Sequence, residues 1–406
     1  MERTVIIGAG QAGGRAAVAL RANGYGGEII LVGQEARAPY ERPPLSKEVL
    51  LGAAQAGAAL VNPESVYHEN SIELRLDMPV RWINSATREL TFMDGDRLGF
   101  QRLILATGAR ARRLEWPGSE AAKPYYLRTC DDAEVLRRTL SGRQGDIAII
   151  GGGFIGLEVA ASARQLGWTV TVIELGQQCL ERVLPSASAR VLVDLHERHG
   201  TRFRWGASVK ETKETNSRIR LLLNDDESLN VDVVVVGIGS EPNMKLAEAA
   251  GLECGNGILV DDQCRTSVSD IYAIGDAAIA PNRWFGKPAR LESWENAERQ
   301  AEQVARVICG LPTTNDAPPW FWTDQFDRNV QIVGVPTDED QMTVEPGKTP
   351  DQYVHLYSRG DVITGAVLFN SGRRRRALSR QMSEMRDAAA APCSPAESVD
   401  SMEINA

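Results

Sequence analysis

The stretch AIIGGGFIGLEVA, residues 148–160, joins an apolar run to a glycine-rich turn and then to a helix-like run. Its glycines, Gly151, Gly153 and Gly156, have the spacing Gly-x-Gly-x-x-Gly. In a strand–turn–helix unit the first glycine permits a tight turn, the second lets the backbone approach a pyrophosphate, and the third lets the helix pack closely on the strand. The free amides at the helix start then face the phosphates. We therefore expect a dinucleotide-binding unit here.

The residue that ends the next expected strand, 169–174, is Glu174. A carboxylate about 20 residues after the glycine turn can bind a ribose 2′-hydroxyl. The same carboxylate would repel a 2′-phosphate, and the nearest arginine beyond it is Arg182. The pattern therefore favours NAD over NADP. The alternative is an acidic residue at a surface strand end, which would have to coincide with three correctly spaced glycines.

A second copy of this pattern opens the chain, in TVIIGAGQAGGRAAVAL, residues 4–20. Here the glycines are Gly8, Gly10 and Gly13, and the ribose-binding position falls on Gln34 or Glu35. For that pair a surface loop remains an open alternative. Two such turns predict two dinucleotides, FAD and NAD(H). A protein that holds both can pass a hydride from nicotinamide to flavin.

Composition excludes several other classes of protein. The chain has 406 residues, 43% apolar and 24% charged, with a net charge of −9. This charge disfavours a broad nucleic-acid surface, and no apolar run approaches the ~20 residues that span a bilayer. The six cysteines form no Cys-x-x-Cys and do not cluster with the four histidines, so we expect no metal site and no redox dithiol. Scattered cysteines suit a reducing compartment, and we expect a cytoplasmic protein.

The strand-like and helix-like runs predict an α/β fold with two Rossmann-like dinucleotide-binding domains and a C-terminal α+β domain. The expected boundaries are an FAD-binding domain at 1–112 and 242–316, an NAD-binding domain at 113–241, and a C-terminal domain at 317–406. Helices are expected at 11–23, 154–166, 294–308 and from about Ala377. The low-complexity tail from about residue 387 is expected to be disordered.

Eight motifs together resemble the FAD-dependent ferredoxin reductases of bacterial oxygenase systems, over residues 5–376. They are IIGAGQAG, YERPPLSKE, LILATGARAR, YLRTCDDAE, IIGGGFIGLEVA, YAIGDAA, ESWENAERQA and PPWFWTDQF. The resemblance implies a glutathione-reductase-like fold. It also implies electron flow from NADH through FAD to a 2Fe–2S ferredoxin, of the Rieske or adrenodoxin-like type, that feeds a mono- or dioxygenase. The expected assembly is a monomer or a weak homodimer.

The resemblance also implies site residues. The implied FAD contacts are Gly8, Gly10, Ala12, Gly13, Gln34, Glu35, Lys47, Val80, Thr107, Gly108, Arg128, Asp276 and Trp294. The implied NAD contacts are Gly151, Gly153, Phe154, Ile155, Gly156, Glu158, Glu174 and Gly239. Lys47 and Glu158 are implied as a pair near the flavin ring, and we predict that they tune it by charge rather than transfer a proton. The structural alternatives are an exposed Lys47, a turn-capping Asp276, an Arg128 in a solvated loop and a Glu158 that is an ordinary helix residue.

The segment YERPPLSKEVL contains no cysteine. Disulfide reductases of this fold carry a cysteine pair in the first helix of the FAD domain or in the NAD domain, and peroxidase and oxidase relatives carry a single cysteine near this segment. Here electrons are therefore expected to leave through the flavin itself. Trp320 and Trp322 have two interpretations, core packing or a cover over the flavin on the side of a docked ferredoxin. Basic residues in two segments, 283–290 and 373–376, are candidates for docking that ferredoxin.

Two other functions share these nucleotide motifs. One is an NADH oxidase or a general NADH:acceptor reductase without a dedicated protein partner. The other is an interaction protein of the apoptosis-inducing-factor type, which binds nucleic acid. The net charge of −9 disfavours the second, because nucleic-acid binding needs a basic surface.

Overall fold

The computed structural model describes residues 2–215, 218–313 and 316–390. Its first sheet is parallel, in the order β18-β7-β1-β2-β3. These strands are β1 (Arg3–Ile7), β2 (Glu28–Val32), β3 (Ile72–Arg75), β7 (Arg102–Leu105) and β18 (Ile271–Ala273). The outermost strand, β18, comes from a part of the chain far beyond the others, so this sheet is assembled from two distant segments, as a domain interrupted by another would be.

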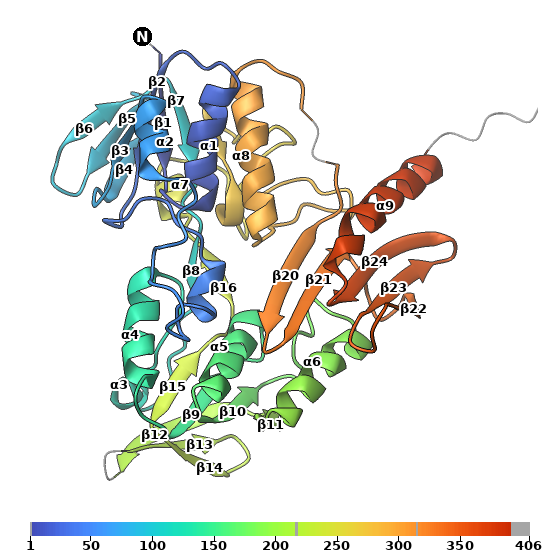
Figure 1. The fold of residues 1–406 in the computed structure, drawn as a ribbon. Helices are drawn as coiled ribbons and strands as arrows, with labels where there is room; N and C mark the ends of the chain where they lie inside the picture. Colours follow the sequence, from blue (N-terminus) through green and yellow to red (C-terminus); the bar gives the residue numbers. More distant parts are fainter. Residues whose placement is uncertain (1, 216–217, 314–315, 391–406) are drawn as a thin grey trace, which may run out of the picture.

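Both faces of the first sheet are covered. Helices α1 (Gln11–Ala22) and α8 (Trp294–Ile308) lie side by side on one face (Figure 1). The other face packs on an antiparallel sheet of β4 (Val80–Asn84), β5 (Glu89–Phe92) and β6 (Arg97–Gly99). Strand β1 serves both layers, because side chains alternate along a strand: Ile6 packs toward the helices, and Val5 and Ile7 pack toward the antiparallel sheet.

A second parallel sheet repeats the design in the order β11-β10-β9-β15. Its strands are β9 (Asp146–Ile150), β10 (Thr169–Glu174), β11 (Arg202–Trp205) and β15 (Val233–Val236). Its helices are α4 (Cys130–Leu140), α5 (Phe154–Gln165) and α6 (Ser186–Arg198), and an antiparallel sheet contains β12 (Val209–Thr215), β13 (Arg218–Leu223) and β14 (Ser228–Val231). The two sheets confirm the predicted pair of Rossmann-like units.

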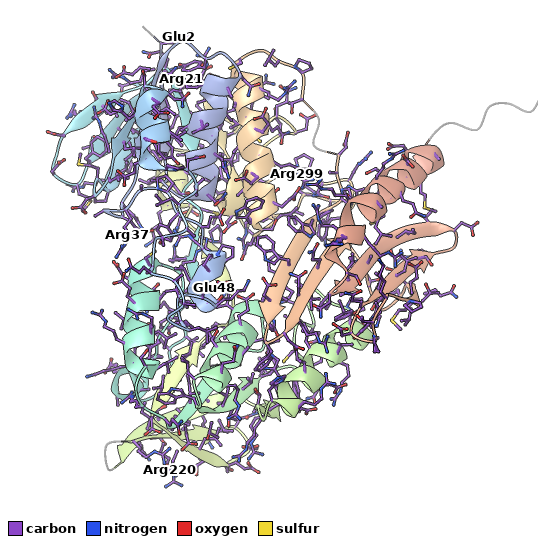
Figure 2. The ribbon with its side chains drawn as sticks, viewed as in Figure 1. Glu2, Arg21, Arg37, Glu48, Arg220 and Arg299 are labelled. Carbon is purple, nitrogen blue, oxygen red and sulfur yellow. The ribbon has the colours of Figure 1, made fainter. Side chains whose placement is uncertain are left out.

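These two units are joined in two places. Strands β8 (Ala109–Ala111) and β16 (Ser240–Pro242) pair antiparallel where the chain leaves the first unit and returns to it. A segment of the first unit, η1 (Pro43–Ser46) and the turn after it, also reaches the second unit and lies against α4 and α5 (Figure 1). Glu48 in this turn lies between the two units (Figure 2). This segment therefore brings residues of the first unit beside the second glycine turn.

The C-terminal unit is an antiparallel sheet in the order β20-β21-β24-β23-β22. Its strands are β20 (Trp320–Gln325), β21 (Arg328–Gly334), β22 (Gln341–Pro346), β23 (Tyr353–Arg359) and β24 (Val362–Phe369). One face packs on α6 of the second unit, and the other packs on α9 (Arg375–Ala390). Figure 2 places Arg299 of α8 toward this unit, and its guanidinium donates to the Ala317 carbonyl at 2.8 Å.

The remaining elements are short. They are α2 (Glu64–Glu69), α3 (Ser119–Ala122), α7 (Lys245–Ala249), β17 (Ile258–Leu259), η2 (Gly275–Ala277), β19 (Ala278–Ile279) and η3 (Gly372–Arg374). Helix α9 begins two residues before the expected Ala377 and continues past residue 387, where the tail was expected to begin. The rest of that tail, residues 391–406, lies outside the described residues.

Local sequence signals explain where the longer helices begin. The Ser293 hydroxyl accepts the Asn296 amide at the start of α8, and Thr129 and Asp132 form a reciprocal capping box at the start of α4. Such caps each stabilise a helix by about 1 kcal/mol. Helices α1 and α5 differ, because each begins at a glycine with no side-chain cap and no acidic residue in the first turn. Their first amides are therefore left for another acceptor.

Candidate active site

The first glycine turn is shaped for the close approach of a phosphate. Gly8 has φ +117°, and a Cβ there would lie 2.1 Å from the Ala106 carbonyl oxygen. A Cβ on Gly13 would lie 1.9 Å from the Gly8 carbonyl oxygen, so α1 packs where only glycine fits. A Cβ on Gly10 would have no atom within 4 Å, so the space before the α1 amides is open. This geometry fits a pyrophosphate at the N-terminus of α1.

Gln34 and Glu35, the two candidates for binding the ribose at the first turn, lie in different environments. Gln34 is exposed, whereas Glu35 is half-buried. The Glu35 carboxylate accepts the Tyr40 hydroxyl at 2.6 Å and pairs with the Arg42 guanidinium at 3.1 Å. Arg42 also donates to the Arg128 carbonyl. Sequence reasoning missed Arg42, although the YERPPLSKE motif contains it.

Arg128 and Asp276 meet at the end of the first sheet. Their side chains form an ion pair of 2.7 Å, and both are largely shielded from solvent. Arg128 also donates to the Ala109 carbonyl at 3.0 Å, and Arg290 donates to the Asp276 carbonyl at 3.1 Å. These contacts exclude the alternative of a solvated Arg128. Asp276 lies in η2, which packs against α8, where the Gly275 amide donates to the Gln300 side chain at 2.7 Å.

Several other predicted residues lie around the same edge. The Thr107 hydroxyl donates to the Asn243 carbonyl at 2.8 Å, and Gly108 has φ +62°. Ala12 is buried in the first turn of α1. Val80 begins β4 and packs, partly buried, against the core below the sheet. At the start of α8, Trp294 donates its indole N–H to the Glu41 carboxylate at 3.2 Å.

Lys47 and Glu158 form the centre of the site. Their charged atoms lie 3.2 Å apart, with 11% and 4% of their side chains exposed. The Glu158 carboxylate also accepts the Ser46 hydroxyl and, at 2.6 Å, the Thr323 hydroxyl. Burial raises the pKa of Glu158, and Lys47 and the two hydroxyls act in the opposite direction. Lys47 therefore favours the charged form of a carboxylate whose pKa is raised by burial.

The Lys47 ammonium has two further neighbours, both on β20. It lies 3.4 Å from the Asp324 carboxylate and 5.9 Å from the centroid of the Trp322 ring. The site thus draws on three parts of the chain: the segment after η1, helix α5 and strand β20. Ser46, Thr323 and Asp324 were not predicted, because their role depends on packing between distant segments.

The second glycine turn has the same geometry as the first. Gly151 has φ +104°, and a Cβ on Gly156 would lie 2.1 Å from the Gly151 carbonyl oxygen. A Cβ on Gly153 would lie no closer than 3.8 Å to any neighbour. The Glu174 carboxylate accepts the Gly152 amide at 2.6 Å and the Gly176 amide at 2.8 Å. These two hydrogen bonds fix Glu174 beside the glycine turn, where it could bind the ribose of a dinucleotide whose phosphates lie at the N-terminus of α5.

The other residues predicted for the NAD side surround this turn. Phe154 packs on Phe321 of β20 with ring centroids 4.5 Å apart. Ile155 leaves 45% of its surface exposed, although it lies in the first turn of α5. Gly239 has φ +98° and accepts the Arg112 amide at 3.0 Å. An exposed Ile155 beside open backbone amides is a surface suited to a flat ligand.

Three tryptophans form a continuous aromatic cluster beside the Lys47 site. Trp320 and Trp322 stack with centroids 5.2 Å apart, and Trp322 meets Trp294 edge-on at 5.9 Å. The Arg375 guanidinium lies 4.1 Å from the centroid of the Trp320 ring. Since side chains alternate along β20, Trp320, Trp322 and Asp324 share one face. Both interpretations of the tryptophans therefore remain compatible with the packing.

Several basic side chains of the two segments, 283–290 and 373–376, form ion pairs within the protein. Arg283 pairs with Asp387 at 2.9 Å, and Arg290 pairs with Glu292. Arg374 pairs with Glu345, and Arg375 is partly covered by Trp320. The exposed basic residues of the two segments are Lys287, Arg373, Arg374 and Arg376, and of these Arg374 pairs with Glu345.

The described cysteines are ordinary buried or half-buried thiols. Cys130, Cys179, Cys254, Cys264 and Cys309 are all free. Burial raises the pKa of each, and that of Cys179 reaches about 12. Within residues 2–215, 218–313 and 316–390, no group of three or more His, Cys, Asp or Glu side chains is arranged to hold a metal ion. In the same residues, no helix is both long and apolar enough to cross a membrane.

Both nucleotide sites fit their expected ligands on structural grounds. Each has a helix N-terminus without a side-chain cap, and each has open space at its second glycine, Gly10 or Gly153. The first site adds the Arg128–Asp276 pair, which supplies polar groups for a polyol chain and a phosphate. The second adds Glu174 for ribose hydroxyls. The residues present therefore suit FAD at the first turn and NAD(H) at the second.

Comparisons with known proteins identify the family. Residues 2–301 match the model described as pyridine nucleotide-disulphide oxidoreductase, and residues 320–401 match the model described as reductase C-terminal. A rubredoxin-NAD(+) reductase of Pseudomonas putida is 42% identical over 341 residues, which cover 84% of this chain and 88% of that protein. The ferredoxin–NAD(+) reductase component of the 3-phenylpropionate/cinnamic acid dioxygenase of Photorhabdus laumondii is 37% identical over 93% of this chain and 95% of its own.

Solved structures give the same result. A covalent complex of putidaredoxin reductase with putidaredoxin matches with a TM-score of 0.89 and 33% identity, over 94% of this chain and 93% of that one. The ferredoxin reductase for the CYP199A2 system of Rhodopseudomonas palustris matches with a TM-score of 0.87 and 35% identity, over 96% of this chain and all of that one. The chain therefore belongs to the pyridine nucleotide-disulphide oxidoreductase family, and within it to the ferredoxin–NAD(+) reductases, which use FAD and NAD(H).

Proposed function

We propose that this protein passes electrons from NADH, through FAD, to a 2Fe–2S ferredoxin that feeds a bacterial mono- or dioxygenase. The observation that carries the proposal is the Lys47–Glu158 ion pair, buried where the FAD-side segment, the NAD-side helix α5 and β20 meet. The described cysteines are all free, so they form no disulfide with each other that could accept electrons. Relatives named as reductase components of dioxygenase systems support the kind of acceptor.

The protein's own residues bind, orient and set charge. Bound FAD would supply a centre that can take up two electrons together and give them up one at a time. The N-terminus of α8, which contacts Trp322 through Trp294, carries the positive end of the helix dipole and favours negative charge nearby. Lys47 adds a positive charge beside this region, and Glu158 fixes its position. Glu174 selects a dinucleotide with a free 2′-hydroxyl.

The proposed organisation follows the connections between units. The β8–β16 pair lies near residues 112 and 241, which supports those two boundaries of the NAD-binding domain. The boundary between residues 316 and 317 is proposed from the change to an antiparallel sheet at β20. A cytoplasmic location is proposed from the free cysteines, and a monomer or weak homodimer is the proposed assembly.

The acceptor is tested by NADH oxidation with three candidate sinks. One relative is named a rubredoxin-NAD(+) reductase, so a rubredoxin is the second candidate acceptor. Purified holoprotein is mixed with NADH in air alone, with a 2Fe–2S ferredoxin, and with a rubredoxin, each protein acceptor coupled to cytochrome c. A large acceleration by the ferredoxin supports the proposal. A response to rubredoxin alone reassigns the partner, and fast oxidation in air with no response to either protein makes the chain an oxidase.

A further inference from the structure

A chain of buried polar side chains continues from Glu158 away from the nucleotide sites. Thr323 donates to Glu158 at 2.6 Å, and Gln325 lies 3.1 Å from the Thr323 hydroxyl. The Gln325 carbonyl lies 2.9 Å from Nε2 of His196 on α6, and Nδ1 of His196 lies 3.3 Å from the Thr201 hydroxyl. All five residues are buried, with at most 4% of their surface exposed.

The alternation of β20 creates this chain. Thr323 and Gln325 point to the face opposite Trp322 and Asp324, toward α5 and α6. Aromatic rings enclose the imidazole of His196: Phe326 lies 5.0 Å away and Phe203 lies 6.2 Å away, measured between ring centroids. Buried polar atoms in such surroundings need partners, so each member of the chain depends on the next.

The charge of Glu158 fixes the direction of every hydrogen bond. The Thr323 hydroxyl has one proton to donate, and an ionised Glu158 accepts the hydrogen bond from it. Thr323 then accepts from the Gln325 amide nitrogen, which leaves the Gln325 oxygen to accept from Nε2–H of His196. The remaining ring nitrogen accepts from Thr201. This direction needs a neutral imidazole, and burial lowers the pKa of His196 to about 4.

The opposite direction is self-consistent only if Glu158 carries a proton. Glu158 would then donate to Thr323, and each later donor would become an acceptor. Removing Gln325 takes the N–H donor away from the Thr323 oxygen, and this weakens the polarised hydrogen bond that Thr323 donates to the carboxylate. The chain therefore couples the hydrogen bonding of α6 to the ionisation of Glu158.

We propose that Thr201, His196, Gln325 and Thr323 act as positioning residues that hold Glu158 in its anionic form. The anionic Glu158 in turn keeps the Lys47 ammonium in place beside the nucleotide sites. The inference rests on the proposed role of this pair in electron transfer from NADH. The charged groups that face Glu158 are Lys47 and, beyond it, Asp324, and the titratable group that faces His196 is His199 of the same helix.

The test is a pH titration of Glu158 by infrared difference spectroscopy on the holoprotein. The carbonyl band of protonated Glu158 is identified by its loss in Glu158→Gln. In Gln325→Met, the midpoint of this band should move upward by about one pH unit, a tenfold change in the protonation equilibrium. Gln325→Leu replaces it if Gln325→Met does not fold.

Ser188→Ala is the matched control. Ser188 also lies on α6 and links it to the same sheet, through the His355 ring at 2.9 Å and the Tyr357 hydroxyl at 2.7 Å. Its network does not reach Glu158. Ser188→Ala should leave the Glu158 midpoint unchanged. An unchanged midpoint in the Gln325 variant, or an equal shift in Ser188→Ala, would overturn the proposal.

A second readout uses the anaerobic reduction of the flavin by NADH, with no protein acceptor present. The acid limb of its pH profile should move upward in Gln325→Met by the same amount as the infrared midpoint, and it should not move in Ser188→Ala. An acid limb that stays in place would contradict the proposed link to Lys47. If NADH does not reduce the wild-type flavin, the proposed function is wrong. The infrared titration would still show whether Gln325 affects the protonation midpoint of Glu158.

Discussion

Removing the Lys47 ammonium should destabilise the protein strongly at neutral pH. Lys47→Met keeps the length of the side chain and leaves Glu158 buried without its cation. Breaking a buried ion pair by removing one partner costs about 3–5 kcal/mol of unfolding free energy. Because the Ser46 and Thr323 hydroxyls still donate to the carboxylate, we expect a loss near the lower limit, about 3 kcal/mol.

The loss of unfolding free energy in Lys47→Met should increase as the pH rises. The pKa of Glu158 is already raised in the folded protein, and Lys47→Met raises it further because the cation is gone. A carboxyl with a raised folded pKa contributes stability that is fully present below the unfolded pKa and lost as pH rises through the folded pKa. The variant should therefore approach wild-type stability in acid and diverge from it toward neutral pH.

The assay is urea unfolding of the holoprotein from acid to neutral pH, with saturating FAD. Lys47→Met/Glu158→Gln removes both charges and should abolish the pH-dependent part of the loss. Lys210→Met, which breaks the exposed pair of Lys210 with Asp226, should give no measurable change. A Lys47→Met loss that is absent, or that does not vary with pH, would refute the reasoning.

Three further predictions concern the nucleotide and partner sites. Gly156→Ala should destabilise the fold, because its Cβ would lie 2.1 Å from a carbonyl oxygen, whereas Gly153→Ala should preserve thermal stability and weaken NADH binding. Glu174→Ala should weaken NADH binding by about tenfold and reduce the preference for NADH over NADPH, as measured by the concentration dependence of flavin reduction with each nucleotide. If Arg373 and Arg376 help to dock an acidic ferredoxin, Arg373→Gln/Arg376→Gln should slow the ferredoxin reaction at low salt and reduce its salt dependence, while NADH reduction of the flavin stays unchanged.

The fold was largely predictable because its signals are local. Glycine spacing located both βα turns, and the expected elements at 169–174 and 294–308 coincide with β10 and α8. Each signal depends on the steric needs of one turn or on the periodicity of one segment. The end of α9 was less predictable, because helical propensity continues through DAAA without a stop signal.

The centre of the site was predictable only in part. Lys47 and Glu158 were expected from the resemblance, but the other donors to Glu158 were not. Thr323 lies 165 positions from Glu158 in sequence, and a threonine on a strand gives no signal of a buried carboxylate on a distant helix. Arg42 was missed for the same reason, since its partners follow from the path of the segment around η1.

The most direct test of the central claim is a single-turnover measurement. The flavin is reduced anaerobically with NADH and then mixed in a stopped-flow instrument with oxidised putidaredoxin, with oxidised rubredoxin, or with air-saturated buffer. The account predicts that a 2Fe–2S ferredoxin reoxidises the flavin much faster than oxygen does. Reoxidation that is as fast with oxygen as with either protein would contradict it.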